Sequence, residues 1–216
     1  MFRLLILDFD GVVLESVSVK TDAFQALFST EPDHMGEIVE FHIKNGGMSR
    51  FDKFRYIYGN ILKKDLDPIT FNMLSEKFSD LVFQRVLHVP FVPGAAEFLE
   101  RWSAILPLYI VSATPEKELK EIVRARNLTR YFRNVYGAPR KKAECIQEIL
   151  MESGSSASEV LFVGDALNDL AAARVSGVKF VGRSAEGNVN IFRNCVGVER
   201  VVPDLIGLSR YLEGLS

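Results

Sequence analysis

The chain has 216 residues, of which 48% are hydrophobic and 25% charged, and its formal net charge is −2. These values are ordinary for a globular protein and exclude the basic surface of a nucleic-acid-binding protein. Cys145 and Cys195 give no disulfide or zinc pattern, no apolar stretch approaches the roughly 18 residues of a membrane span, and the first residues do not resemble a signal peptide. We therefore expect a cytoplasmic protein that binds neither membrane nor nucleic acid; the sequence leaves the oligomeric state open.

The first predicted strand covers residues 4–7, four aliphatic residues that lead into Asp8, Asp10 and Gly11. A short apolar run bounded by turn residues is typical of a buried strand in a parallel sheet. Ligands bind such sheets at the carboxyl ends of the strands, where Asp8 and Asp10 would lie. Two carboxylates there are costly unless a cation or a function holds them.

Residues 16–88 show helical rather than strand-like spacing of their apolar side chains. Ser49 is expected to cap one helix of this segment, and Gly46-Gly47 and Asp67-Pro68 interrupt it. The sequence therefore predicts an all-helical insert over 16–88, joined to a core made of residues 1–15 and 89–216.

Strands and helices alternate from residue 89 onward. Apolar runs at 106–111, 134–136, 160–163 and 178–181 predict strands, and helices are expected over 95–102, 141–150, 167–175 and 205–212. Thr114 is expected to cap a further helix whose first residue is Pro115. Repeated strand–helix units predict an α/β fold: a doubly wound, Rossmann-like parallel sheet.

Polar side chains follow the ends of four predicted strands, which lie side by side in such a sheet. They comprise carboxylates, one hydroxyl and two ammonium groups: Asp8, Asp10, Ser112, Lys141, Lys142, Asp165 and Asp169. Facing carboxylates suit Mg2+, and a hydroxyl, backbone N–H groups and an ammonium suit a phosphate. The combination predicts a phosphoryl-transfer site.

These residues resemble the four motifs of the haloacid dehalogenase superfamily, in the order in which that family carries them. The motifs are Asp8-Phe9-Asp10-Gly11-Val12, Ser112, the lysine that follows Gly137-Ala138-Pro139, and Gly164-Asp165-x-x-x-Asp169. The helical insert between the first two resembles the C1 cap subclass. The resemblance implies a phosphatase, with phosphoglycolate-type and sugar-phosphate enzymes as the nearest relatives by layout.

The resemblance implies unlike roles for the first two aspartates. Asp8 would be the nucleophile, forming an aspartyl-phosphate. Asp10 would act as general acid and then as base, with its side chain free of the metal and able to carry a proton. The ligands of Mg2+ would be Asp8, the main-chain carbonyl of Asp10 and Asp165.

The remaining motif residues would bind or neutralise the phosphate. Lys142 fits the motif better than Lys141 and would balance the developing charge, and Asp169 would orient that lysine or a metal-bound water. Phosphate binding is expected of the residues Gly11, Ser112 and Ala113.

The insert contributes one candidate residue, Arg50. The segment Gly47-Met48-Ser49-Arg50 resembles the Gly-x-Ser-Arg of sugar phosphomutases, and Arg50 could reach over a substrate anion. The leading hypothesis is a Mg2+-dependent phosphatase that hydrolyses a small phosphorylated metabolite. The alternatives are a β-phosphoglucomutase-like sugar phosphomutase and a non-catalytic module that binds a phosphate ligand.

Overall fold

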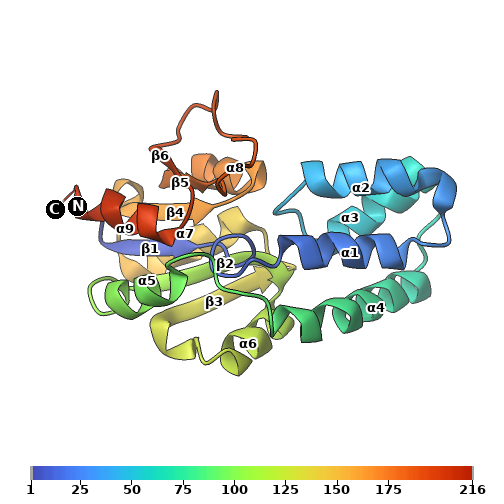
Figure 1. The fold of residues 1–216 in the computed structure, drawn as a ribbon, viewed down its shortest axis with the longest axis horizontal. Helices are drawn as coiled ribbons and strands as arrows, with labels where there is room; N and C mark the ends of the chain where they lie inside the picture. Colours follow the sequence, from blue (N-terminus) through green and yellow to red (C-terminus); the bar gives the residue numbers. More distant parts are fainter. Residues whose placement is uncertain (1, 216) are drawn as a thin grey trace.

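The structure is a computed structural model that describes residues 2–215. Its centre is a parallel sheet whose strands are ordered β3-β2-β1-β4-β5-β6 (Figure 1). The strands are β1 (Leu4–Leu7), β2 (Leu108–Pro115), β3 (Phe132–Ala138), β4 (Val160–Gly164), β5 (Lys179–Arg183) and β6 (Arg200–Val202). All four residues of the central β1 are buried, as expected for a strand covered on both faces.

Helices cover both faces of the sheet. The helices α5 (Ala95–Trp102), α6 (Glu116–Ala125) and α9 (Leu205–Glu213) pack on one face, and α7 (Lys142–Ser153) and α8 (Leu167–Ser176) on the other. Alternate residues of β1 serve the two layers, with Leu5 and Leu7 facing the first and Leu4 and Ile6 the second. This arrangement confirms the predicted doubly wound α/β fold.

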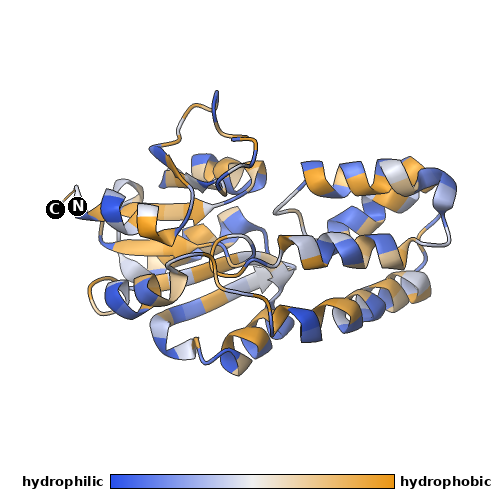
Figure 2. Ribbon diagram, viewed as in Figure 1, coloured by the Kyte–Doolittle hydropathy of each residue, from blue (hydrophilic) through white to orange (hydrophobic). Residues whose placement is uncertain are grey.

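The segment between β1 and α5 is helical and lies beyond the carboxyl ends of the strands (Figure 1). It contains α1 (Val17–Leu27), α2 (Met35–Lys44), α3 (Arg50–Tyr56), a π-helical turn (Ile57–Leu62) and α4 (Pro68–Val86). Apolar and polar residues alternate along these helices (Figure 2). Their apolar faces meet around Phe24, Phe54 and Phe78, whose ring centroids lie 4.9–6.2 Å apart.

Two short chain segments connect this helical segment to the sheet. The N–H of Glu15 donates to the Pro90 carbonyl at 3.0 Å, and the N–H of Val92 donates to the Val13 carbonyl at 3.0 Å. The division into residues 16–88 and a core of 1–15 and 89–216 remains an interpretation of these connections.

Helix starts follow the local signals in part. The Ser49 side chain accepts from the Asp52 N–H at 3.2 Å, which confirms the expected cap. The predicted Thr114 cap is wrong, because β2 continues to Pro115 and α6 begins at Glu116. The helix α2 lies within the predicted helical insert, whereas the three-residue strand β6 was not predicted.

No helix within residues 2–215 is long and apolar enough to span a membrane.

Candidate active site

Asp8 follows β1 and Asp169 lies in the first turn of α8, which follows β4; both contact one buried lysine. Lys142, the first residue of α7, reaches from the opposite side, and its Nζ donates to Asp8 Oδ2 at 2.8 Å and to Asp169 Oδ1 at 2.5 Å. Burial alone would lower the pKa of Lys142, but Asp169 and Asp8 outweigh it and hold this pKa above its usual value. Lys142 is therefore a fixed positive charge beside the Asp8 carboxylate. The neighbouring Lys141 is exposed, so the geometry favours Lys142.

Three carboxylates gather at this point. Asp8, Asp165 and Asp169 each offer an oxygen, and these oxygens all lie within 4.8 Å of one another. Burial raises the pKa of Asp8 to about 7, with Lys142 opposing and Asp169 reinforcing that effect. Burial, followed by repulsion from Asp8 and Asp169, also raises the pKa of Asp165. Such mutual repulsion is relieved by a divalent cation, and an all-oxygen donor set fits Mg2+.

Asp169 already has partners on both of its oxygens. Beyond Lys142, its Oδ2 accepts from the N–H groups of Asp165 and Ala166 at 3.1 and 3.0 Å. These bonds suit the predicted orienting role and leave Asp8 and Asp165 as the side chains best placed to face an ion.

Gly11 leaves space for Asp165. Its φ is +75°, and a Cβ there would lie 2.0 Å from Asp165 Oδ2. The N–H of Gly11 donates to the Leu14 carbonyl at 2.8 Å. Its predicted phosphate contact stays a prediction, and its observed contribution is a tight turn beside the carboxylates.

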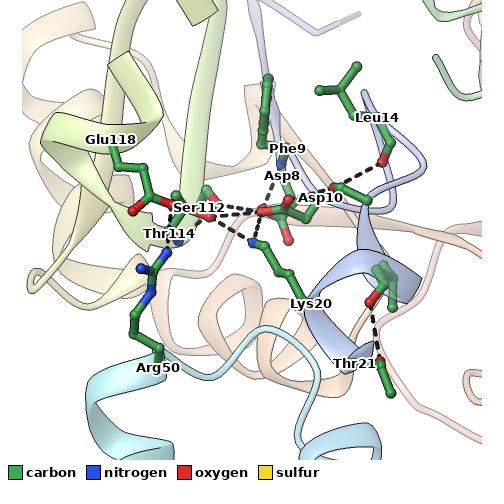
Figure 3. A network of polar contacts seen from close by, with 12 residues as sticks. Asp8, Phe9, Asp10, Leu14, Lys20, Thr21, Arg50, Ser112, Thr114 and Glu118 are labelled. Atoms are coloured by element: carbon green, nitrogen blue, oxygen red, sulfur yellow. Dashed lines mark hydrogen bonds and ion pairs between the residues drawn. The ribbon is translucent and has the colours of Figure 1, made fainter. Parts of the chain in front are cut away.

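Asp10 lies outside this trio and has a separate set of partners (Figure 3). Its Oδ1 accepts from Ser16 Oγ at 2.6 Å, and its Oδ2 accepts from Thr114 Oγ1 at 2.9 Å and from Lys20 Nζ. Burial would raise the pKa of Asp10, but Lys20 and the hydroxyl groups outweigh it and hold this pKa below its usual value. The contacts thus favour the ionised carboxylate rather than the proton-carrying form expected from the sequence.

The end of β2 supplies the hydroxyl groups of the site. Ser112 Oγ lies 3.4 Å from Asp10 Oδ2 and accepts from the Thr114 N–H at 3.2 Å. Thr114 Oγ1 also accepts from Lys20 Nζ at 2.8 Å. Ser112, Ala113 and Thr114 all face the same cavity.

The loop that delivers Lys142 is held by Glu116. The Glu116 carboxylate accepts from Arg140 at 2.5 Å, from Lys120 at 2.6 Å and from the N–H of Gly137 at 3.2 Å. Burial opposes ionisation, but the hydrogen bonds from Lys120, Arg140 and Gly137 prevail and lower the pKa of Glu116 to about 2.

A cavity of about 130 Å3 lies between the strand ends and helices α1 to α4. Arg50, from the start of α3, lines it, but both of its terminal nitrogens have partners. Nη1 donates to Ser79 Oγ at 2.7 Å and Nη2 to Glu118 Oε1 at 2.6 Å (Figure 3). The expectation that Arg50 covers a substrate anion stays a prediction, and the observed ion pair does not support it.

Most of the predicted site residues therefore meet at one edge of the sheet, but four further residues were missed. They are Lys20, His42, Lys53 and Thr114, which all line the cavity. The sequence held one indication for Lys53. It stands three residues after Arg50 and next to the apolar Phe54, so all three side chains lie on one side of the same helix.

The fold and this cluster are those of an α/β enzyme with its site at the carboxyl ends of the strands. The model of the haloacid dehalogenase-like hydrolase family matches residues 2–177. The chain belongs to this family, which confirms the resemblance and the expectation of an enzyme.

Two comparisons support the same assignment. A phosphoglycolate phosphatase of Pseudomonas fluorescens is 25% identical over 193 residues, which cover 84% of this chain and 69% of the relative. A hydrolase from Pseudomonas syringae shares the fold with a TM-score of 0.81 and 22% identity over 99% of both chains.

A third comparison concerns a structure that contains a metal. The HAD-hydrolase YfnB of Bacillus subtilis, whose structure is bound to magnesium, has a TM-score of 0.72 and 16% identity over 98% of both chains. At this identity the comparison shows a shared fold.

Proposed function

We propose that the protein is a Mg2+-dependent phosphatase that hydrolyses a small phosphomonoester through an aspartyl-phosphate on Asp8. The observation that carries the proposal is the contact of Asp8 with Lys142 inside a trio of carboxylates. The names of the phosphoglycolate phosphatase relatives point to the same activity. A cavity of about 130 Å3 suits a small substrate, because drug-sized ligands occupy about 300–1,000 Å3.

The first step transfers the phosphoryl group to the protein. A carboxylate oxygen of Asp8 attacks phosphorus, the bond to the ester oxygen breaks, and the leaving oxygen takes a proton from Asp10. Lys142 balances the negative charge beside Asp8, and Ser112 with the Ala113 N–H binds phosphate oxygens. Mg2+ bound by Asp8, the Asp10 carbonyl and Asp165 would reduce repulsion between the nucleophile and the anionic substrate.

The second step releases phosphate. Asp10 takes a proton from a water molecule, whose oxygen attacks phosphorus, and the bond to Asp8 breaks. The contacts of Asp10 with Lys20 and Thr114 stabilise the carboxylate that this step needs. The first step needs a proton on Asp10, and the contact with Lys20 disfavours this proton.

The test is Mg2+-dependent release of phosphate from an aryl phosphate and from a panel of phosphorylated metabolites. Wild-type protein should release phosphate, and removal of Mg2+ with a chelator should abolish the release. Asp8→Asn should lower kcat by at least about 1,000-fold, since removal of a nucleophile has effects of this size or larger. Asp33→Asn, the same change at an exposed position, is the matched control.

Equal activity of wild-type protein and Asp8→Asn would contradict the proposal, as would the absence of activity on every ester. The phosphomutase alternative is tested with a hexose 1-phosphate and the corresponding bisphosphate. Formation of the isomer faster than release of phosphate would replace the phosphatase with that alternative.

A further inference from the structure

The helical side of the cavity carries three cationic side chains, and two of them have a carboxylate partner. Lys20 pairs with Asp10, and Arg50 pairs with Glu118. Within residues 2–215 Lys53 forms no ion pair with a carboxylate, although only 4% of its surface is exposed.

Within the described part of the chain, the Lys53 ammonium contacts neutral groups. Its Nζ lies 3.1 Å from His42 Nδ1 and 3.0 Å from the His42 carbonyl oxygen, and 5.5 Å from the centroid of the Phe24 ring. Burial, followed by repulsion from Lys53 and Lys20, lowers the pKa of His42 to about 3, so the imidazole is neutral. An Nδ1 that accepts from Lys53 leaves the ring proton on Nε2, which provides a second donor.

Such an arrangement is costly in an unliganded protein. Burial, with repulsion from Lys20 as a smaller cause, lowers the pKa of Lys53 to about 7. A buried ammonium without a counter-ion is destabilising unless it is paired, and an anion in the cavity would supply that partner.

The position of Lys53 argues against a purely structural role. A lysine that only fills a helix interface normally extends its ammonium to water. Here Lys53 and His42 line the same cavity as Asp8 and Ser112, which lie on the sheet side.

We propose that Lys53 and His42 bind a second anionic group of the substrate, a carboxylate or a second phosphate, at the end remote from the phosphoryl group that is transferred. The inference rests on the proposed phosphatase function and specifies its substrate class: short phosphomonoesters with a second negative charge. The cavity has the carboxylates Asp8 and Asp165 on its sheet side and Lys53 on its helical side, so it offers a place for each end of such a molecule.

The test compares substrates that differ in the remote group alone. Phosphoglycolate carries a carboxylate, 2-hydroxyethyl phosphate of similar length carries a neutral hydroxyl, and ethylene glycol bisphosphate carries a second phosphate. Wild-type protein should show a kcat/KM about 10–100-fold higher for phosphoglycolate, for ethylene glycol bisphosphate or for both than for 2-hydroxyethyl phosphate. This range is typical of a charge-assisted hydrogen bond. The better of the two identifies the anion as carboxylate or phosphate.

Lys53→Met should reduce this preference to within about threefold, mainly through KM. Lys44→Met is the matched control, because Lys44 is an exposed lysine on α2 and should keep the wild-type preference. Circular dichroism checks that both variants are folded.

Equal kcat/KM of the wild-type protein for the three substrates would overturn the inference while leaving the phosphatase proposal intact, and this result needs no variant. An equal loss on all substrates in Lys53→Met would likewise overturn it. Hydrolysis of an aryl phosphate but of none of the three compounds would overturn the second-anion site alone. No hydrolysis of any ester would overturn both proposals.

Discussion

Replacing Lys53 with methionine should make the protein more stable at pH 6. The pKa of Lys53 falls from 10.5 to about 7 on folding, and at about 1.4 kcal/mol per pKa unit this corresponds to an upper bound of about 5 kcal/mol. The variant also loses two hydrogen bonds to His42, which offsets about 1–3 kcal/mol. The expected net gain in the free energy of unfolding is therefore at most about 2–4 kcal/mol.

The gain should depend on pH in a defined direction. Because the pKa of Lys53 is lower in the folded protein than in the unfolded chain, the penalty for burying the ammonium is complete below pH 7. It shrinks as the pH rises from about 7 and is nearly gone at pH 10.5, where the amine is neutral in the folded protein and half protonated in the unfolded chain. At pH 10.5 the variant should therefore be no more stable than the wild type.

Urea unfolding of wild type, Lys53→Met and Lys44→Met at pH 6 and pH 10.5 measures this difference. Lys44 forms an exposed pair with Glu40, so its replacement should change stability by less than about 0.5 kcal/mol at either pH. A Lys53→Met protein that is less stable than wild type at pH 6, or equally shifted at both pH values, would refute the unpaired-ammonium reasoning.

Three further changes probe the site and its supports. Gly11→Ala should cost about 1–3 kcal/mol of stability by calorimetry and lower kcat at least about 10-fold, because φ is +75° and the new Cβ would collide with Asp165. Glu116→Gln should lower the free energy of unfolding by about 1 kcal/mol at pH 7, measured by urea unfolding. Because the pKa of Glu116 is about 2 in the folded protein and 4.5 in the unfolded chain, the stability difference between wild type and variant should vanish as the pH falls from 4.5 to 2. Arg50→Met should cost about 3 kcal/mol in the same assay, because Glu118, whose side chain is 10% exposed, loses its cation and keeps the hydrogen bond from Ser79; Arg50→Met/Glu118→Met should recover most of this cost. No recovery in the double variant would contradict the last expectation.

The residues at the strand ends were predictable because local pattern and topology agree there. Asp8, Ser112 and Asp165 each follow an apolar run, and parallel strands bring their carboxyl ends to one edge. Lys142 could be chosen over Lys141 from motif spacing, and its contact with Asp8 agrees with that choice.

Thr114 shows where local pattern is overruled. Thr-Pro is a strong signal for a helix start, yet the hydroxyl donates to Asp10, a residue 104 positions away. The Thr114 hydroxyl could cap the helix or donate to the buried Asp10 carboxylate. It donates to Asp10, because a buried carboxylate without hydrogen-bond donors is costly. The strand β6 was missed because three residues are too few to show a strand periodicity of their own.

Lys20, Arg50 and Lys53 show what periodicity cannot reveal. Spacing predicts which side of a helix is buried, but the sheet edge that this side faces depends on the arrangement of α1 and α3 over the strands. In the folded protein Lys20 binds Asp10 and Arg50 binds Glu118, so two of the three cations already link the helical segment to the sheet or its helices. A substrate with its phosphoryl group at Asp8 and a second anion at Lys53 would form a third link between the sheet and the helical segment. Recognition of the remote anion would therefore stabilise the same arrangement that holds Asp10 in place, and removal of Lys53 should lower the selectivity for substrates that carry this anion.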